Sequence, residues 1–263
     1  MRYRPIVSAR INYSHPLASN LIFASDQDGA GSFTDLVSGT RGIPQSGAVS
    51  VISEFGRASK GNNSSTGTVR FAMPDSFRHF TATDFTVVVF GNHDSTQTSS
   101  SPLIGMSGNP NWIWLGINGS SRAGAVLDEG NTLGKKEIAS VGGFQEYFNT
   151  PALWVLKRTG QTLEVSMDAG ADKGTTTLSG QESMSNANLY FHGAPIGDAG
   201  DGTVYTAYIF NRSLTDAEQQ SILDDPWALK RPVVPVFAFG AAAPPVGAPI
   251  PVFIQHYRNQ GMM

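Results

Sequence analysis

Residues 202–227 read GTVYTAYIFNRSLTDAEQQSILDDPW, and this stretch decides the fold class. Its first part is rich in β-branched and aromatic residues, which predicts a buried strand over 203–210. Thr215 and Glu218 then form a T-x-x-E capping box, in which the two side chains satisfy free amide groups at the start of a helix. Pro226 ends that helix, because proline cannot continue the hydrogen-bond ladder. The face of the helix that we expect to be buried consists of Leu214, Ala217 and Ile222.

The rest of the chain before residue 232 shows apolar stretches of strand length, separated by clusters of Gly, Asn, Ser and Asp such as KGNNSSTG and GDAGDG. We expect strands over 20–24, 49–53, 68–72, 84–90, 103–106, 111–117, 124–127, 152–158, 162–168, 188–192 and 203–210. So many short strands with one short helix predict an all-β sandwich or barrel.

Composition excludes several classes of protein. Charged residues make up 15% of the chain, against about 25% in an average soluble protein. The formal net charge of −3 gives no basic surface for nucleic acid. The absence of cysteine excludes a disulfide scaffold, a thiol nucleophile and a zinc site with sulfur ligands. The N-terminus carries Arg2, Arg4 and Arg10 without a following apolar run, so we expect no cleaved signal peptide.

The sharpest change in composition comes after Arg231. Residues 232–263 hold six of the fifteen prolines, and Arg258 is their only formal charge. The prolines argue against a membrane helix and favour an extended arm. One alternative is a floppy terminus, but exposed apolar residues are a solubility liability, so we expect the arm to pack on something. Its apolar residues begin with Val233 and Val234. The candidate assembly residues are Val236, Phe237, Phe239, Ile250, Val252, Phe253, Ile254, Tyr257 and Arg258.

Two stretches at opposite ends of the body carry a family resemblance. SHPLASNLIFA followed by TDLVSG resembles the opening, and the stretch quoted above resembles the closing pattern, of the laminin G-like, concanavalin A-like jelly-roll domains found in tailed-phage virion proteins. FTATDFTVVVF and ALWVLKRTGQTLEVSMDAG are similar to the strands between them. The matching residues of the closing pattern are Gly202, Phe210, Asn211, Arg212, Leu214, Thr215, Glu218, Pro226 and Trp227.

The resemblance covers roughly residues 14 to 231. It implies a lead-in over 1–16, a laminin G-like jelly-roll domain over 17–231 and a Pro-rich apolar arm over 232–263. For the closing pattern we expect structural roles: Asn211 in a turn, Arg212 beside a charged or helical partner, and Trp227 plugging the base of the sandwich.

Concanavalin A-like folds also occur in glucanases, which need two carboxyl groups about 5–5.5 Å apart for retaining hydrolysis. Their E-x-D-x-x-E run is absent from this sequence. Glu164 and Asp168 share a strand face but would lie about 13 Å apart along the strand. With no metal-binding histidine spacing and no G-x-S-x-G motif, the sequence predicts a protein that is not an enzyme.

Two loops offer hard oxygen ligands for calcium, which laminin G-like domains often bind at a loop rim. They contain Asp198 with Asp201 and Asp26 with Asp28. Neither has the ligand count of a dedicated cage, so a plain turn is the other interpretation. No other cofactor is expected.

Trp112 and Trp114 alternate in NWIWLGI and therefore project from one sheet face, while Ile113 and Leu115 project from the other. Apolar residues on both faces favour a central, buried strand. The alternative is a groove for a glycan or a partner protein, which requires an exposed tryptophan.

Taken together, these features lead to one preferred hypothesis and one rival. The preferred hypothesis is a structural or decorating subunit of a phage virion, attached to other capsid or tail proteins through its C-terminal arm and forming a homo-oligomer. It places the protein on the virion, without nucleic-acid binding or membrane insertion, and leaves capsid and tail open. The rival is a carbohydrate-binding module that contacts host surface glycans.

Overall fold

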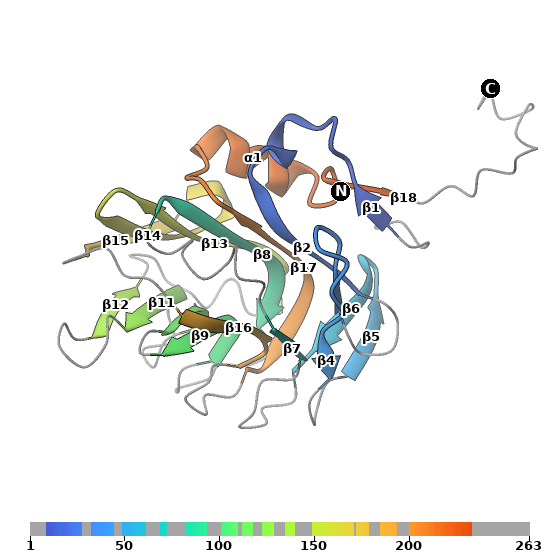
Figure 1. Ribbon diagram of the computed structural model, residues 1–263, viewed down its shortest axis with the longest axis horizontal. Helices are drawn as coiled ribbons and strands as arrows, with labels where there is room; N and C mark the ends of the chain where they lie inside the picture. Colours follow the sequence, from blue (N-terminus) through green and yellow to red (C-terminus); the bar gives the residue numbers. More distant parts are fainter. Residues whose placement is uncertain are drawn as a thin grey trace, which may run out of the picture. The chain divides into compact units, whose positions relative to one another are not determined.

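Two antiparallel sheets stack face to face in the computed structural model of the chain (Figure 1). The structure describes residues 9–27, 33–44, 49–61, 69–72, 83–93, 101–109, 112–117, 123–128, 135–139, 149–170, 172–178, 185–193 and 200–232. Among these residues, no helix is long and apolar enough to cross a membrane. The predictions for residues 233–263 and for Asp198 concern positions outside the described residues.

The seven-stranded sheet has the order β12-β11-β10-β9-β16-β7-β4. Its strands are β4 (Ile43–Pro44), β7 (Val69–Ala72), β9 (Ser101–Asn109), β10 (Trp112–Ile117), β11 (Ala123–Asp128), β12 (Lys135–Ala139) and β16 (Ser185–Phe191). The nine-stranded sheet has the order β15-β14-β13-β8-β17-β2-β3, with β6 paired to β17 and β5 to β6. Its strands are β2 (Leu21–Gln27), β3 (Phe33–Asp35), β5 (Val49–Ser53), β6 (Gly56–Lys60), β8 (Phe85–His93), β13 (Ala152–Thr159), β14 (Thr162–Met167), β15 (Asp172–Thr177) and β17 (Gly202–Phe210).

A third, two-stranded sheet joins the beginning and the end of the described chain. It pairs β1 (Ala9–Ile11) with β18 (Lys230–Pro232). In Figure 1 this pair and the helix α1 (Asp216–Asp224) lie on the outer side of the nine-stranded sheet. Two short 3-10 helices, η1 (Pro16–Ala18) and η5 (Asp168–Gly170), complete the described elements.

Strands β8, β13 and β17 are buried on both faces, because apolar clusters cover each side of the nine-stranded sheet. Val87 and Ile209 belong to the cluster between the two sheets. Val88 and Tyr208 belong to the second cluster, under α1 and η1. This arrangement explains the continuous apolar runs that mark these strands in the sequence.

The predicted all-β sandwich with one short helix is confirmed, and each of the eleven predicted strands coincides with an observed strand. The capping box of Thr215 and Glu218 is also present. The strands that the sequence did not predict are short or polar, such as β15 (DKGTTT), because edge strands bury too little to show an apolar period.

One part of the helix prediction is wrong. Leu214 and Ile222 are buried as expected, but Ala217 is exposed. Gln219 occupies the inward position instead, where its amide contacts Leu214 O and Ser166 Oγ. Because glutamine is polar, a buried glutamine does not contribute to the apolar pattern from which the buried face of a helix is predicted.

Candidate functional site

The root of the C-terminal segment, residues 229–232, is part of the folded body. Ala9 pairs with Pro232 and Ile11 with Lys230, and Asn12 N donates to Leu229 O at 2.9 Å. Residue 232, where the predicted arm begins, is therefore part of a strand. The sequence did not show this pairing, because three-residue strands carry no usable period.

The buried side chain of Lys230 fixes this root through its contacts. Its side chain is 0% exposed, and its Nζ donates to Ser25 O and lies 3.6 Å from Asp26 Oδ1. The same ammonium group lies 5.1 Å from the ring centroid of Trp227 and 5.7 Å from that of Tyr208. A buried ammonium group is tolerated only where such partners replace water. Because Asp26 faces Lys230, its carboxylate does not belong to an exposed calcium loop with Asp28, as the sequence had allowed.

Trp227 is buried, but it lies in the apolar cluster on the outer side of the nine-stranded sheet and does not close the base of the sandwich as predicted. Its ring meets Phe90 edge-on at 6.4 Å. The preceding Pro226 accepts a hydrogen bond from Tyr208 Oη at 2.6 Å. The closing P-W pair therefore ties the chain after α1 to the middle strands of the nine-stranded sheet.

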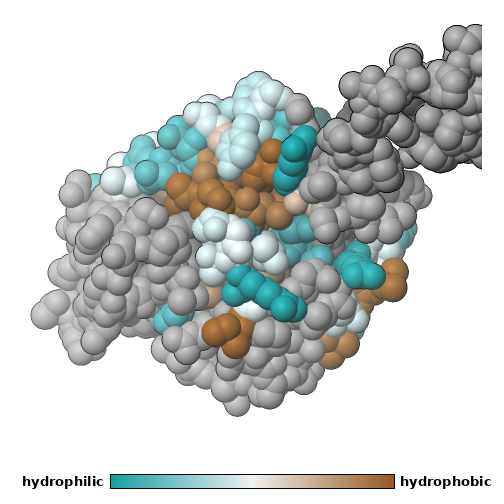
Figure 2. Space-filling model, turned by 45° about the vertical axis from the view of Figure 1, so that its right-hand side comes forward, coloured by the Kyte–Doolittle hydropathy of each residue, from teal (hydrophilic) through white to brown (hydrophobic). Residues whose placement is uncertain are grey.

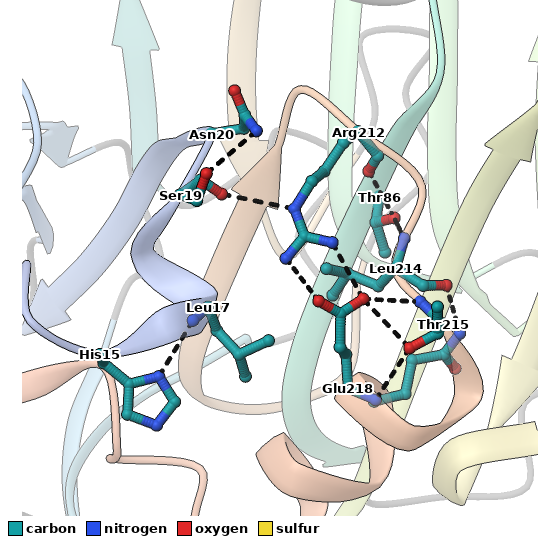
Figure 3. A network of polar contacts seen from close by, with 10 residues as sticks. His15, Leu17, Ser19, Asn20, Thr86, Arg212, Leu214, Thr215 and Glu218 are labelled. Atoms are coloured by element: carbon teal, nitrogen blue, oxygen red, sulfur yellow. Dashed lines mark hydrogen bonds and ion pairs between the residues drawn. The ribbon is translucent and has the colours of Figure 1, made fainter.

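Arg212 and Glu218 form the centre of the polar network in Figure 3. Two guanidinium nitrogens of Arg212 contact the two carboxylate oxygens of Glu218, at 2.9 and 2.7 Å. Hydrogen bonding to Arg212, assisted by Thr215, lowers the pKa of Glu218 to about 2. Arg212 Nε also donates to Ser19 O at 3.4 Å, beside the η1 turn that His15 caps. The opening and closing motifs of the sequence therefore meet at one place, and the expected structural role of Arg212 is confirmed.

Trp114 lies on the central strand β10 and is 1% exposed. It is opposite Gly105 on β9, which in turn pairs with Tyr190 on β16. Trp114 therefore does not offer the exposed platform that the glycan hypothesis requires. Trp112 pairs with Ser107 and Asp128, and its side chain lies outside the described residues.

At the opposite end of strands β8 and β17, two histidines are fully buried. His93 Nδ1 faces the backbone oxygen of Asp201, so this nitrogen carries the proton. His192 Nε2 lies 3.1 Å from Ser59 Oγ. The other ring nitrogens, His93 Nε2 and His192 Nδ1, have no hydrogen-bond partner among the described residues. Burial lowers the pKa of His93 to about 4 and that of His192 to about 3, so both rings are neutral at pH 7.

The backbone around these histidines is tightly packed. His192 has a φ of 54°, a left-handed conformation that is uncommon for residues other than glycine. A side chain on Gly200 would meet the backbone of Pro102 and His192, so only glycine fits there. The sequence treated the five histidines as scattered and missed this pair, because 99 positions separate residues that only the stacking of the two sheets brings together.

Asp201, a candidate calcium ligand, is held by its backbone. Its N–H donates to Ser101 Oγ at 3.0 Å and its carbonyl faces His93. Among the described residues, no group of three or more His, Asp or Glu side chains could hold a metal ion. Ser101 Oγ also lies 3.5 Å from His93 Nδ1. Both side chains are buried, so this serine–histidine contact is closed to a substrate.

The carboxylates that the sequence compared with glucanase residues have other partners. Glu164 pairs with Lys157 at 2.9 Å. Asp168 accepts a hydrogen bond from Leu153 N at 2.9 Å, and burial raises its pKa. Each of the two carboxylates therefore contacts a residue of β13.

An open pocket of about 410 Å³ lies between the chain before η1 and the C-terminal end of α1. Its lining consists of Asn12, His15, Ser221, Asp224, Asp225 and Ala228. His15 Nδ1 accepts a hydrogen bond from Leu17 N, so its Nε2 carries the proton and is a donor. Tyr13, which follows Asn12 in the chain, is 69% exposed. An exposed aromatic ring is the feature that the glycan hypothesis required at Trp112 and Trp114.

Comparison with solved structures places the fold. Trypanosoma rangeli sialidase matches 78% of this chain and 32% of its own, at 15% identity and a TM-score of 0.58. The binding domain of botulinum neurotoxin DC, solved in complex with rat synaptotagmin II, matches 78% of this chain and 51% of its own, at 12% identity and a TM-score of 0.60. The binding domain of Paraclostridial Mosquitocidal Protein 1 matches 81% and 53%, at 12% identity and a TM-score of 0.56.

The chain thus spans about a third of the sialidase and about half of the toxin binding domains. No protein-family model and no curated protein matches the sequence. These comparisons contradict the prediction that the chain is not an enzyme, because the sandwich also occurs as part of an enzyme chain, the sialidase. The prediction rested on the absence of catalytic motifs, and a single sequence does not show which carboxylates meet across strands. At these identities the likeness shows a jelly-roll-like β-sandwich, and it assigns no reaction.

Proposed function

We propose that this chain is an attachment protein of a tailed-phage particle, in which the laminin G-like sandwich is the body and residues 232–263 fasten it to capsid or tail proteins. The motif resemblance of residues 14–231 supports the phage origin. The apolar, nearly uncharged composition of 232–263 supports a segment that other protein surfaces cover.

The observation that carries the proposal is the root of that segment. An attachment segment can hold its body in place only if the residues where the segment begins are fixed to that body. Lys230 meets this need, since its buried ammonium group and the pairing of β18 with β1 hold the chain up to Pro232. A proline-rich segment beyond this point loses less conformational entropy on docking than a flexible one.

Mass spectrometry of purified particles with copy numbers tests the proposal, because an attachment protein is expected there in a fixed, symmetric number. Removal of residues 233–263 retains β18 and should leave a folded body that no longer enters particles. Removal of residues 259–263 alone is the matched control and should enter normally. Absence of the full chain from particles, or normal incorporation of the 233–263 deletion, contradicts the proposal.

A second candidate function is recognition of a host surface glycan by the body, and the open pocket lined by Asn12, which precedes the exposed Tyr13 in the chain, favours it. The carboxylates of Asp224 and Asp225 would accept from sugar hydroxyl groups, and His15 Nε2 would donate to them. Structures with this fold include toxin binding domains and a sialidase solved with 2,3-difluorosialic acid.

Glycan-array binding of the full chain tests this candidate. Tyr13→Ala and Asp224→Asn should each weaken binding about tenfold, the effect of losing one good contact. Gln161→Ala, an exposed turn position away from the pocket, should bind normally. Unchanged binding of both pocket variants places any glycan elsewhere and contradicts this candidate.

A further inference from the structure

The free edge of β5 exposes apolar side chains. Ile52 is 84% exposed and Val49 is 49% exposed, and Ile43, the first residue of β4 (Ile43–Pro44), is 60% exposed. Figure 2 shows apolar surface at the lower right of the body, on the side where β4, β5 and β6 lie in Figure 1. Strand β5 pairs with β6 on one side, and no described strand pairs with its other side.

This edge lacks the devices by which proteins usually prevent edge pairing. The five residues of β5, VSVIS, include no charge and no proline. Such an edge presents unpaired N–H and C=O groups to any extended chain of matching chemistry. By contrast, β15 at the far end of the same sheet carries Asp172 and Lys173.

The sequence itself contains a segment of that chemistry. Residues 252–257 read VFIQHY, which is rich in β-branched and aromatic residues and free of proline and formal charge. We propose that this segment of one copy adds as a strand to the free edge of β5 in a second copy. The inference rests on the proposed role of residues 232–263 as an attachment segment, and it names the surface on which that segment binds.

Chain length allows contact with a second copy. Nineteen residues lie between Pro232 and Val252, and Pro235, Pro244, Pro245, Pro249 and Pro251 favour an extended path between them. That path spans about 60 Å at roughly 3.1 Å per residue. A compact domain of this size is only about 45 Å across. A path of this length allows the segment to reach a second copy, where it would cover Ile52 and Val49 of the neighbour.

The cysteine-free chain allows a direct test by disulfide trapping between two full-length variants, Ile52→Cys and Gln255→Cys. Mixed in equal amounts and mildly oxidised, they should form a covalent heterodimer of twice 28.0 kDa. Gln161→Cys, at an exposed turn of β13 and β14, replaces Ile52→Cys as the matched control and should give at least about tenfold less product. In the otherwise wild-type chain, the substitution Ile52→Lys should weaken self-association at least about tenfold, because it removes the free energy gained by burying an isoleucine side chain.

Three outcomes overturn the inference. Heterodimer no more abundant than in the control shows that the segment does not reach β5. Faster homodimer formation by Ile52→Cys alone shows that the edge pairs with itself. A disulfide within one chain of the double variant Ile52→Cys, Gln255→Cys at low concentration shows docking on the same body. If trapping fails while the 233–263 deletion still abolishes incorporation into particles, the attachment proposal stands and only this surface is wrong.

Discussion

Strands β8 and β17 run side by side through the nine-stranded sheet. The polar groups near one end of this pair are charged and paired, whereas those near the other end are neutral. At the end of Phe85 and Phe210, the charged groups of Arg212 and Glu218 are paired. On the outer side of the same sheet Lys230 of β18 is paired with Asp26. At the end of His93 and Gly202, two buried imidazoles each have one nitrogen without a partner among the described residues. The first end gains stability from its charges, while the second keeps its groups neutral. The following variants sharpen this contrast.

The largest effect is expected from Lys230→Ala. The substitution leaves Asp26 and the carbonyl of Ser25 buried without their cation, which should lower the free energy of unfolding by about 3–5 kcal/mol. Urea denaturation measures the change. Lys173→Ala, on an exposed edge strand, is the control and should stay within about 0.5 kcal/mol. A loss below about 1 kcal/mol for Lys230→Ala would show that the root is not held by this charge.

The pH dependence of stability probes the opposite end. The pKa values of His93 and His192 are lowered to about 4 and about 3, so below pH 6.5 the unfolded chain binds protons that the folded chain excludes. Stability should therefore fall as the pH drops from 6.5 toward 4, by up to about 2.7 kcal/mol per pH unit for two protons.

His192→Asn should remove about half of that slope, since asparagine tolerates the left-handed backbone and does not titrate. Gln161→Ala, an exposed turn position without a titratable group, is the control and should leave the slope unchanged. Denaturation series between pH 4 and 7 measure both. A slope that His192→Asn does not alter would refute a neutral buried ring at this position.

The smallest effect is expected from Glu218→Gln. Glutamine preserves the capping box but removes the charge that Arg212 contacts, which should cost about 1–2 kcal/mol at pH 7. Because the pKa of Glu218 is lowered from 4.5 to about 2, its contribution is present above pH 4.5 and is lost as the pH falls through about 2. The difference between the two proteins should therefore close at pH 2. Glu54→Gln, at an exposed turn, should have no measurable effect at either pH.

The same contrast explains how much could be predicted. The capping box and the buried strands follow from local rules, because neighbours within a few residues set a helix start or an apolar period. The pocket of Asn12, His15 and Asp224 escaped prediction because it joins segments about 200 residues apart. Trp114 looked like a possible platform, but burial is a property of what packs over a residue.

By itself, the sequence determined that this protein is an all-β sandwich or barrel with one capped helix and a nearly uncharged, proline-rich C-terminal segment. These features depend on residue type and short-range period. Only the tertiary structure decided which groups share an environment: Lys230 with Asp26, His93 with His192, and a free β5 edge with exposed Ile52. The reason is that strand order and register follow from the packing of the whole core, and a single sequence does not reveal which distant strands will be neighbours.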